Sequence, residues 1–410
     1  MKKLLFVALL FSMAACTVPI KENKVTTGKI ISFYSKILGE KREIWIHTPD
    51  GANDPDKHYP VLYLLDGDTH FNTVVGMVQQ LSEANGNTLI PQMIVVGILN
   101  TDRTRDLTPT NSLYGPDGAK VDGFKASGGG EKFESFIEKE LIHHIDSAYH
   151  PAPYKMLVGH SFGGLTAMNI VVHHPDMFNS YIVIDPSMWW DKRKLLGEAG
   201  KALNQTKFSG KALYLGIANT MPAGMDTLQV RLDSSGKTGH IRSILALKDT
   251  FQHSKNNGLR WTYRYYKDDD HSSVPMIATY DGLRFIFDFY RMPKDKESKI
   301  EDIHGKIDPA PIFTEHYDDV SNRMGFKILP PEQVINEIAY YYMGSGEKTK
   351  AYSLFSLNVK NYPNSANVYD SMGDYYSDQH DKAKAIEYYK KSLKIQKNPA
   401  TQKKLEALTK

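Results

Sequence analysis

The chain has 410 residues, of which 41% are hydrophobic and 24% charged, with a formal net charge of +3 and a single cysteine. This composition is that of a globular protein, and the length predicts two or three domains. The small net charge, without a long basic run, argues against a nucleic-acid partner, and one cysteine excludes an intramolecular disulfide.

The first sixteen residues have the pattern of a secretory signal. Lys2 and Lys3 precede an apolar run, residues 4–11, that is too short to span a bilayer as a mature helix. Cys16 lies at the expected processing point, which resembles a bacterial lipoprotein signal whose cysteine carries lipid. We therefore expect a signal at 1–16, a tether at 17–27, and an exported protein held to the membrane of the cell envelope by lipid. An ordinary signal peptide with an incidental cysteine is the alternative.

The following segments alternate between strand-like and helical patterns. Residues 29–37 and 42–47 predict an antiparallel strand pair, short apolar strands follow at 61–65, 93–98, 156–158, 181–184 and 212–217, and 259–266 predicts a last strand. Between them, one helical stretch carries an apolar stripe formed by Phe133, Ile137, Leu141 and Ile145. Apolar strands alternating with helices predict an α/β fold over residues 28–292, with a mostly parallel sheet covered on both faces.

The C-terminal part has a different texture. Residues 293–330 are charged and have few apolar runs, which predicts a linker or an irregular wrap. Residues 331–410 read as helical and repeat every 34 positions, as in Ala351 and Ala385 or Phe355 and Tyr389. This period resembles tetratricopeptide repeats, with a generic pair of helical hairpins as the alternative. Two such units rarely stand alone, so we expect them to lean on the catalytic domain or on a protein partner.

The segment GHSFGG, residues 159–164, places a serine in the pattern G-x-S-x-G between a predicted strand and a predicted helix. Strand, tight turn and helix form the context in which this motif presents a nucleophile. Glycines remove the side chains that would collide at such a turn. Ser161 would then project above the sheet, and the amide of Phe162 could donate to an oxyanion. A glycine-rich turn without chemistry is the alternative.

The serine needs a base and an acid. His271 is the predicted base, because it lies a few residues after the last predicted strand, where a loop returns over the sheet. The acid is expected between the serine and the histidine, and Asp226 is the first carboxylate after the strand 212–217. Asp226 lies nine residues past Ile217, which is far for an acid that must reach the histidine. Two alternatives therefore stay open: an acid among residues 268–270, or a serine–histidine pair that works without a carboxylate.

A second oxyanion donor is expected after the strand 61–65. Gly67 allows the close backbone approach that such a donor needs, so the amides of Gly67 and Asp68 are the candidates. A plain strand-to-helix turn is the alternative. We expect no cofactor and no metal, since no cysteine–histidine cluster of zinc spacing occurs in the sequence.

Several stretches together resemble the putative-esterase family of α/β-hydrolases, especially its siderophore (enterobactin-type) esterases. They are YPVLYLLDGD at 59–68, VGI at 96–98, RTRDLTP at 103–109, GHSFGG, PSMWWD at 186–191 and HSSVP at 271–275. The resemblance implies an α/β-hydrolase fold and serine hydrolysis of carboxylic esters through Ser161 and His271. It also implies that Arg103 or Arg105 contacts an anionic ligand. Family members often carry the acid directly after the strand 212–217, and this chain does not.

The sequence thus predicts a lipid-anchored serine esterase with C-terminal helical repeats. The enzyme would form an acyl-enzyme with a small-molecule ester. Trp189 and Trp190 follow the strand 181–184 and either stack on an aromatic acyl group, such as a catecholate or ferulate, or cap the core. Two other functions stay open. One is an esterase acting on feruloyl or acetyl groups of polysaccharide, and the other is a non-catalytic scaffold lipoprotein that uses the repeats.

Overall fold

The computed structural model describes residues 24–52, 54 and 57–409. The predicted signal and Cys16 lie outside these residues. Within the described part of the chain, no helix is both long enough and apolar enough to cross a membrane.

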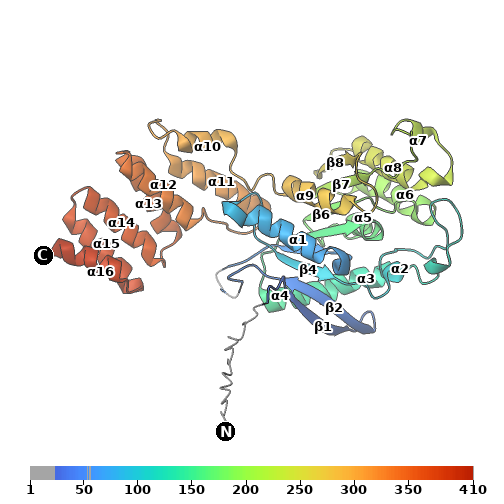
Figure 1. The fold of residues 1–410 in the computed structure, drawn as a ribbon, viewed down its shortest axis with the longest axis horizontal. Coiled ribbons are helices and arrows are strands. Elements are labelled where there is room, and N and C mark those ends of the chain that lie inside the picture. The colour runs from blue at the N-terminus through green and yellow to red at the C-terminus, as the bar shows by residue number, and fades with distance from the viewer. Residues whose placement is uncertain (1–23, 53, 55–56, 410) are drawn as a thin grey trace, which may run out of the picture.

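The described residues form one eight-stranded sheet (Figure 1). Its strands are β1 Lys29–Ser35, β2 Glu40–His47, β3 Val61–Leu64, β4 Ile94–Ile98, β5 Lys155–His160, β6 Ser180–Ile184, β7 Ala212–Ala218 and β8 Arg260–Tyr266. The order in the sheet is β1-β2-β4-β3-β5-β6-β7-β8. The first two pairings, β1 with β2 and β2 with β4, are antiparallel, and the others are parallel. The predicted α/β fold with a mostly parallel sheet is confirmed.

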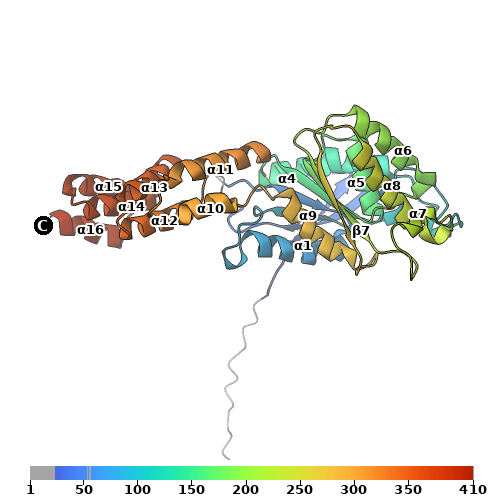
Figure 2. The same cartoon turned by 90° about the horizontal axis from the view of Figure 1, so that it is seen from above.

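Helices cover both faces of the sheet (Figure 2). The helices up to residue 286 are α1 Gly67–Ser82, α2 Arg103–Asp106, α3 Gly130–Phe136, α4 Ile142–Tyr149, α5 Phe162–His173, α6 Trp190–Gln205, α7 Gln229–Leu232, α8 Gly239–His253 and α9 Val274–Ile286. A π-helical turn, Ile137–Leu141, joins α3 to α4. Residues of α3 to α6 and α8 share one core, and those of α1 and α9 share the other.

The pleat of the strands divides these two cores. Val61 and Tyr63 of β3 belong to the core of α5, whereas Leu62 and Leu64 belong to the core of α1, because successive side chains of a strand point to opposite faces. Parallel strands bring their carboxyl ends to one edge of the sheet. The loops after β3, β5, β6, β7 and β8 therefore meet there, and this edge is where α/β sheets bind their ligands.

The segment 293–330 differs from the predicted linker, because it forms two helices, α10 Lys294–Glu301 and α11 Pro309–Met324. Val320 and Met324 of α11 enter the core beneath α1 and α9. Ala310 and Phe313 of the same helix join the core of the C-terminal helices. One helix thus belongs to both cores, and this shared packing docks the C-terminal region onto the sheet domain.

The C-terminal region consists of α12 Glu332–Gly344, α13 Lys348–Asn361, α14 Ala366–Asp378, α15 Lys382–Ile395 and α16 Pro399–Thr409. Both ends of α14 lie 34 residues after those of α12, and both ends of α15 lie 34 after those of α13. The period in the sequence is therefore a period in the structure. The assignment of these hairpins to tetratricopeptide repeats stays a prediction.

Candidate active site

Ser161 stands between β5 and α5 with φ 60° and ψ −114°. An L-residue rarely adopts such a positive φ, and strain of this kind costs about 1–3 kcal/mol and persists only where the surroundings enforce it. The neighbouring glycine makes the turn possible, since a Cβ on Gly159 would lie 2.2 Å from the carbonyl oxygen of Gly163. The turn lifts the serine side chain above the carboxyl edge of the sheet.

His271 lies in the loop between β8 and α9 and reaches Ser161. The Ser161 hydroxyl can donate to its Nε2, which is 3.1 Å from Oγ. Asn219, at the end of β7, supports this loop from below: its backbone N–H donates to the Asp269 carbonyl at 2.8 Å, and its side-chain amide donates to the Lys267 carbonyl at 2.9 Å. The predicted pair of Ser161 and His271 is therefore brought within hydrogen-bond distance.

The carboxylate beside His271 is Asp185, the residue directly after β6. His271 Nδ1 lies 2.6 Å from Asp185 Oδ2. The carboxyl group is fully buried, and it also accepts from the backbone N–H of Ala218 at 3.0 Å and from Nε2 of His240 at 2.8 Å. Burial raises the pKa of Asp185, but the hydrogen bonds from His240 and His271 outweigh it, so the pKa lies below its ordinary value. Asp185 is thus held ionised behind the histidine.

Asp226 does not make this contact, so its predicted place as the acid is corrected. Its Oδ1 accepts from the backbone amides of Leu228 and Gln229 at 2.8 and 2.7 Å. It is an exposed residue that closes the turn before α7. The alternative at 268–270 is also a turn, because Asp270 accepts from the amides of Ser272 and Ser273.

A second histidine, His160, packs its ring 4.5 Å from the ring of His271. Burial, reinforced by the neighbouring His271, lowers the pKa of His160 to about 3. His160 is therefore uncharged at neutral pH. It offers His271 a packing surface without placing a positive charge beside that ring.

The predicted oxyanion donors lie at two adjacent helix starts. Gly67 is the first residue of α1 and Phe162 the first of α5, and the amides of a first helical turn have no partner within the helix. These helices follow β3 and β5, which are neighbours in the sheet. Gly67 is required there, since a Cβ would lie 2.7 Å from the backbone of Gly97. The amides of Gly67, Asp68 and Phe162 thus stay the candidates for an oxyanion site.

The two predicted substrate arginines already have acidic partners. Arg103 donates to both carboxylate oxygens of Asp66, at 2.6 and 3.0 Å. Arg105 forms a two-point contact with Glu40, at 2.7 and 3.1 Å, and a further bond with Asp106. Both guanidinium groups therefore fasten loops at this edge of the sheet, and neither offers an unpaired charge.

The two tryptophans differ in position. Trp190 is 2% exposed and donates from its ring nitrogen to the Thr110 carbonyl at 3.0 Å, so it belongs to the core. Trp189 is half-buried, with its ring 6.1 Å from that of Phe162, and it lines a cavity of about 740 Å³. Of the pair, Trp189 is the more exposed and the one that lines this cavity.

Three further side chains of this cavity are cationic. Lys192 and Arg193 stand in a run of three consecutive left-handed residues, with φ of 55° and 67°. Arg242, from α8, bonds only to neutral oxygens of Thr238 and Ser235 among the hydrogen bonds of the described residues. One acid, Asp191, shares the lining. The cavity is therefore positively charged overall and has an aromatic wall.

One group of the described residues could together ligate an ion, because the ligand atoms of Asp185, His240 and His271 lie within 4.8 Å of one another. Asp185 Oδ2 already accepts from both imidazoles. Hydrogen bonding by itself accounts for the proximity of the three side chains.

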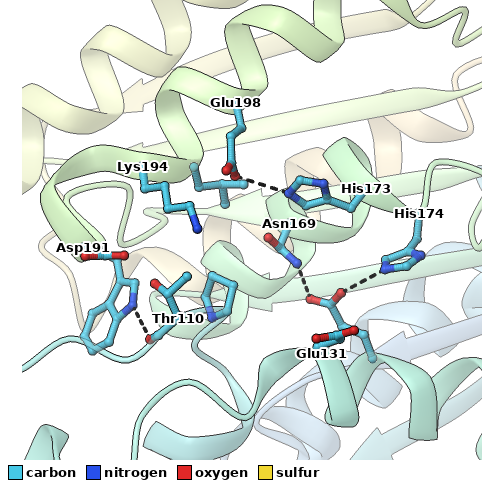
Figure 3. A pocket seen from close by; sticks show the side chains of 12 residues that line it. Thr110, Glu131, Asn169, His173, His174, Asp191, Lys194 and Glu198 are labelled. Carbon is cyan, nitrogen blue, oxygen red and sulfur yellow. Dashed lines mark hydrogen bonds and ion pairs between the residues drawn. The ribbon is translucent and has the colours of Figure 1, made fainter.

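A second cavity, of about 330 Å³, is lined by Trp190 and by residues of α3, α5 and α6 (Figure 3). Glu134 also lines it, is 2% exposed and accepts from Asn169 at 2.8 Å. His174 lies 3.5 Å from the other carboxylate oxygen. Burial raises the pKa of Glu134 to about 8, so this carboxyl group keeps its proton at neutral pH.

A family model described as putative esterase matches residues 35–292. The chain belongs to this family. It is a carboxylic ester hydrolase by that membership. The ferri-bacillibactin esterase BesA of Bacillus subtilis is 27% identical over 251 residues, which are 59% of this chain and 83% of that protein. The siderophore enterobactin esterase of Emericella nidulans is 29% identical over 183 residues, 42% of this chain and 57% of that protein.

Solved structures agree with this membership. An IroE-like serine hydrolase from Shewanella oneidensis is 31% identical, with a TM-score of 0.67, and covers 81% of this chain and 98% of its own. An uncharacterised protein from Capnocytophaga ochracea, 18% identical with a TM-score of 0.63, shares the fold over 93% of this chain and 99% of its own. The predicted membership and fold of this esterase are confirmed.

Sequence reasoning missed Asp185, Ser187 and His240. Asp185 had a usable signal, because it directly follows the predicted strand 181–184, at the same edge as Ser161. Ser187 lies two residues further, with its Oγ 3.5 Å from that of Ser161. His240 had no such signal: it lies on α8, before the last strand, and only the packing of α8 against α6 and β7 brings it to the site.

Proposed function

We propose that this protein is a serine esterase in which Ser161 is the nucleophile, His271 the general base and Asp185 the acid. The observation that carries the proposal is the continuous chain of contacts from Ser161 Oγ through His271 to Asp185, at 3.1 and 2.6 Å. Nucleophile, base and orienting carboxylate within hydrogen-bond reach are the diagnostic arrangement for acyl transfer.

In the proposed mechanism, Ser161 Oγ attacks the ester carbonyl carbon while His271 Nε2 takes the hydroxyl proton. The amides of Phe162 and of Gly67 or Asp68 receive the oxyanion of the tetrahedral intermediate. The intermediate collapses to an acyl-enzyme, and His271 returns the proton to the departing alcohol. Water, activated by the same nitrogen, then releases the acid. Asp185 fixes the Nδ1–H tautomer of His271 and stabilises the imidazolium that forms.

The nucleophile is tested by labelling with a fluorophosphonate, which reacts with activated serines. We expect wild type to be labelled, Ser161→Ala to be unlabelled, and His271→Ala to label very slowly. Each of these variants should lose at least about a thousandfold in kcat on a short acyl ester. Equal labelling of wild type and Ser161→Ala would refute the assignment, and so would the absence of label on wild type.

We further propose that the substrate is a siderophore-type ester with an anionic aromatic acyl group, such as a catecholate. Both relatives cited above are named for siderophore ester hydrolysis. In this chain the cavity at Trp189 supports the same substrate class. Trp189 and Tyr114 offer aromatic surface, and Lys192, Arg193 and Arg242 offer positive charge. Aromatic stacking and charge-assisted hydrogen bonds are the interactions that such a group can use.

The substrate class is tested on a panel of three esters: a ferric catecholate triester, a feruloyl ester and a neutral short acyl ester. We expect the catecholate ester to have the highest kcat/KM. Combining Lys192→Ala with Arg242→Ala should raise its KM about tenfold, the effect of losing roughly 1.4 kcal/mol of binding, and leave the neutral ester unaffected. Hydrolysis of the feruloyl ester alone would refute the siderophore proposal and favour a polysaccharide esterase.

Export and lipid anchoring through Cys16 are part of the same proposal, and they rest on the sequence pattern of residues 1–16. Expression of Cys16→Ser should leave the protein in the soluble fraction of the envelope, whereas wild type should stay with the membranes. Equal partitioning of the two would refute the anchor. The proposed role of the repeats is to hold a protein partner.

A further inference from the structure

The carboxylate that orients His271 is shared with a second histidine. His240 Nε2 lies 2.8 Å from Asp185 Oδ2, the same oxygen that lies 2.6 Å from His271 Nδ1. The two imidazole rings are perpendicular, with their centroids 5.1 Å apart. His240 is mostly buried, at 16% exposure of its side chain. It stands in the first turn of α8, which therefore sends a side chain to the catalytic edge.

A buried carboxylate needs several donors to remain ionised and in one orientation. Asp185 has three: the backbone N–H of Ala218 on Oδ1, and the two imidazoles on Oδ2. Of these, His271 must move a proton and change its charge during the reaction, so it cannot be the group that fixes the carboxylate. Ala218 holds only the other oxygen. His240 is the remaining donor on the oxygen that faces the base.

Asp185 itself has φ 40°, so its backbone leaves the strand in an unusual direction. Such a position holds a side chain accurately only when contacts on the side chain also enforce it. A displacement of about 1 Å at a catalytic group can cost on the order of a hundredfold in rate. A donor on Oδ2 is therefore valuable to catalysis although it never touches the substrate.

We propose that His240 is a positioning residue for the acid: its Nε2–H holds Asp185 Oδ2 in the place from which the carboxylate orients His271. The inference rests on the proposed roles of Ser161, His271 and Asp185. His240 acts as a hydrogen-bond donor through its Nε2–H and takes no part in proton transfer. Its contribution lies in kcat, because Asp185 supports the imidazolium that forms only as the reaction proceeds.

The test replaces His240 with side chains that keep or remove the donor. In His240→Gln the amide keeps an N–H at a similar reach, and we expect kcat within about threefold of wild type. In His240→Leu the donor is lost, and we expect kcat to fall about tenfold to a hundredfold with KM nearly unchanged. His240→Asn carries the same amide on a shorter side chain that does not reach Asp185, so it should behave like His240→Leu. The matched control is His253→Gln, at the exposed far end of the same helix.

A double-mutant cycle shows whether His240 acts through Asp185. In an Asp185→Ala background, His240→Leu should cause no further loss, because the group that it positions is gone. An equal loss in both backgrounds would overturn the proposal. Wild-type kcat in His240→Leu would also overturn it, and so would equal losses in His240→Gln and His240→Leu. If His240→Leu does not fold, the comparison of His240→Gln with His240→Asn decides the question by the same criterion.

Two further measurements separate this inference from its alternatives. If dialysis of wild type against EDTA removes the activity and Zn²⁺ restores it, the three side chains hold an ion, and the positioning role is wrong. If wild type itself is not labelled by the fluorophosphonate, the proposed function fails. If wild type is labelled and hydrolyses ester, and only the donor series shows no effect, this inference alone fails.

Discussion

Side chains that meet at the sheet come from distant parts of the chain, whereas contacts in the C-terminal helices join neighbouring hairpins and include pairs that lie one repeat apart. Ser161 and His271 are separated by 110 residues, and Asp185 and His271 by 86. In the helical region, Tyr340 donates to Asp374, 34 residues on, and Lys404 contacts Asp370, again at a distance of 34. The chemistry therefore depends on the whole sheet, while each helical contact depends on neighbouring hairpins.

This difference predicts that substitutions at the carboxyl edge of the sheet lower the activity, whereas substitutions in the repeats lower only the local stability of the helices. A substitution in the repeats that lowers kcat while the protein stays fully folded would contradict this prediction. Substitutions at the carboxylate beside His271, in the core of the esterase domain and in the repeats test the prediction.

The largest effect is expected at the acid. Asp185→Asn should lower kcat about a thousandfold to ten-thousandfold, because an amide cannot stabilise the imidazolium or select the correct tautomer of His271. Asp226→Asn, the matched carboxylate on the exposed turn, should stay within twofold. Steady-state kinetics on a short acyl ester measure both. A large loss in Asp226→Asn with little change in Asp185→Asn would reverse the assignment.

The next effect is a pH dependence of stability located in the esterase domain. The pKa of Glu134 is raised to about 8, so the folded protein keeps a proton that the unfolded chain releases near its ordinary value of 4.5. The stability from this group is complete below pH 4.5 and is lost as pH rises through 8. When the pH rises from 5.5 to 8.5, the free energy of unfolding of wild type should therefore fall by about 3 kcal/mol more than that of Glu134→Gln, which has no proton to release.

Urea unfolding at the two pH values measures this difference. Glu131→Gln, an exposed neighbour on the same helix, is the control and should follow wild type. If Glu134→Gln also follows wild type, then Glu134 is ionised in the folded protein and the proton is not held in the cavity of Figure 3.

The smallest effect is expected in the repeats. A Cβ on Gly373 would lie 2.5 Å from the ring of Tyr389, so Gly373→Ala should push α14 and α15 apart and cost about 1–3 kcal/mol. Gly344→Ala, at a helical glycine whose Cβ would meet nothing within 4 Å, is the matched control. It should be neutral or slightly stabilising. Hydrogen exchange should rise over α14 and α15 only, with kcat unchanged in both variants.

Most of the fold could be predicted from the sequence, because strands 61–65, 156–158 and 181–184 carry their own pattern and GHSFGG carries the turn. Ser161 and His271 could be placed by chain order, since Ser161 directly follows one strand and His271 lies in the loop after the last strand. His240, in contrast, depends on how α8 packs against α6 and β7. The pairing of Arg103 with Asp66 likewise depends on loops brought together by the sheet, and neither could be read along the chain. The helices in 293–330 were missed because the few apolar residues of α11 are shared between two cores.

The loop that carries His271 is supported by two different strands, and this has a bearing on how related chains are compared. At the end of β7, Asn219 holds the loop through backbone carbonyls, while at the end of β6, Asp185 supplies the charge. The ends of two neighbouring strands therefore contact this one loop, and in this chain the carboxylate stands at the end of β6. Transferring the acid by strand number would mark the wrong position here, whereas a search for the carboxylate nearest the histidine would not.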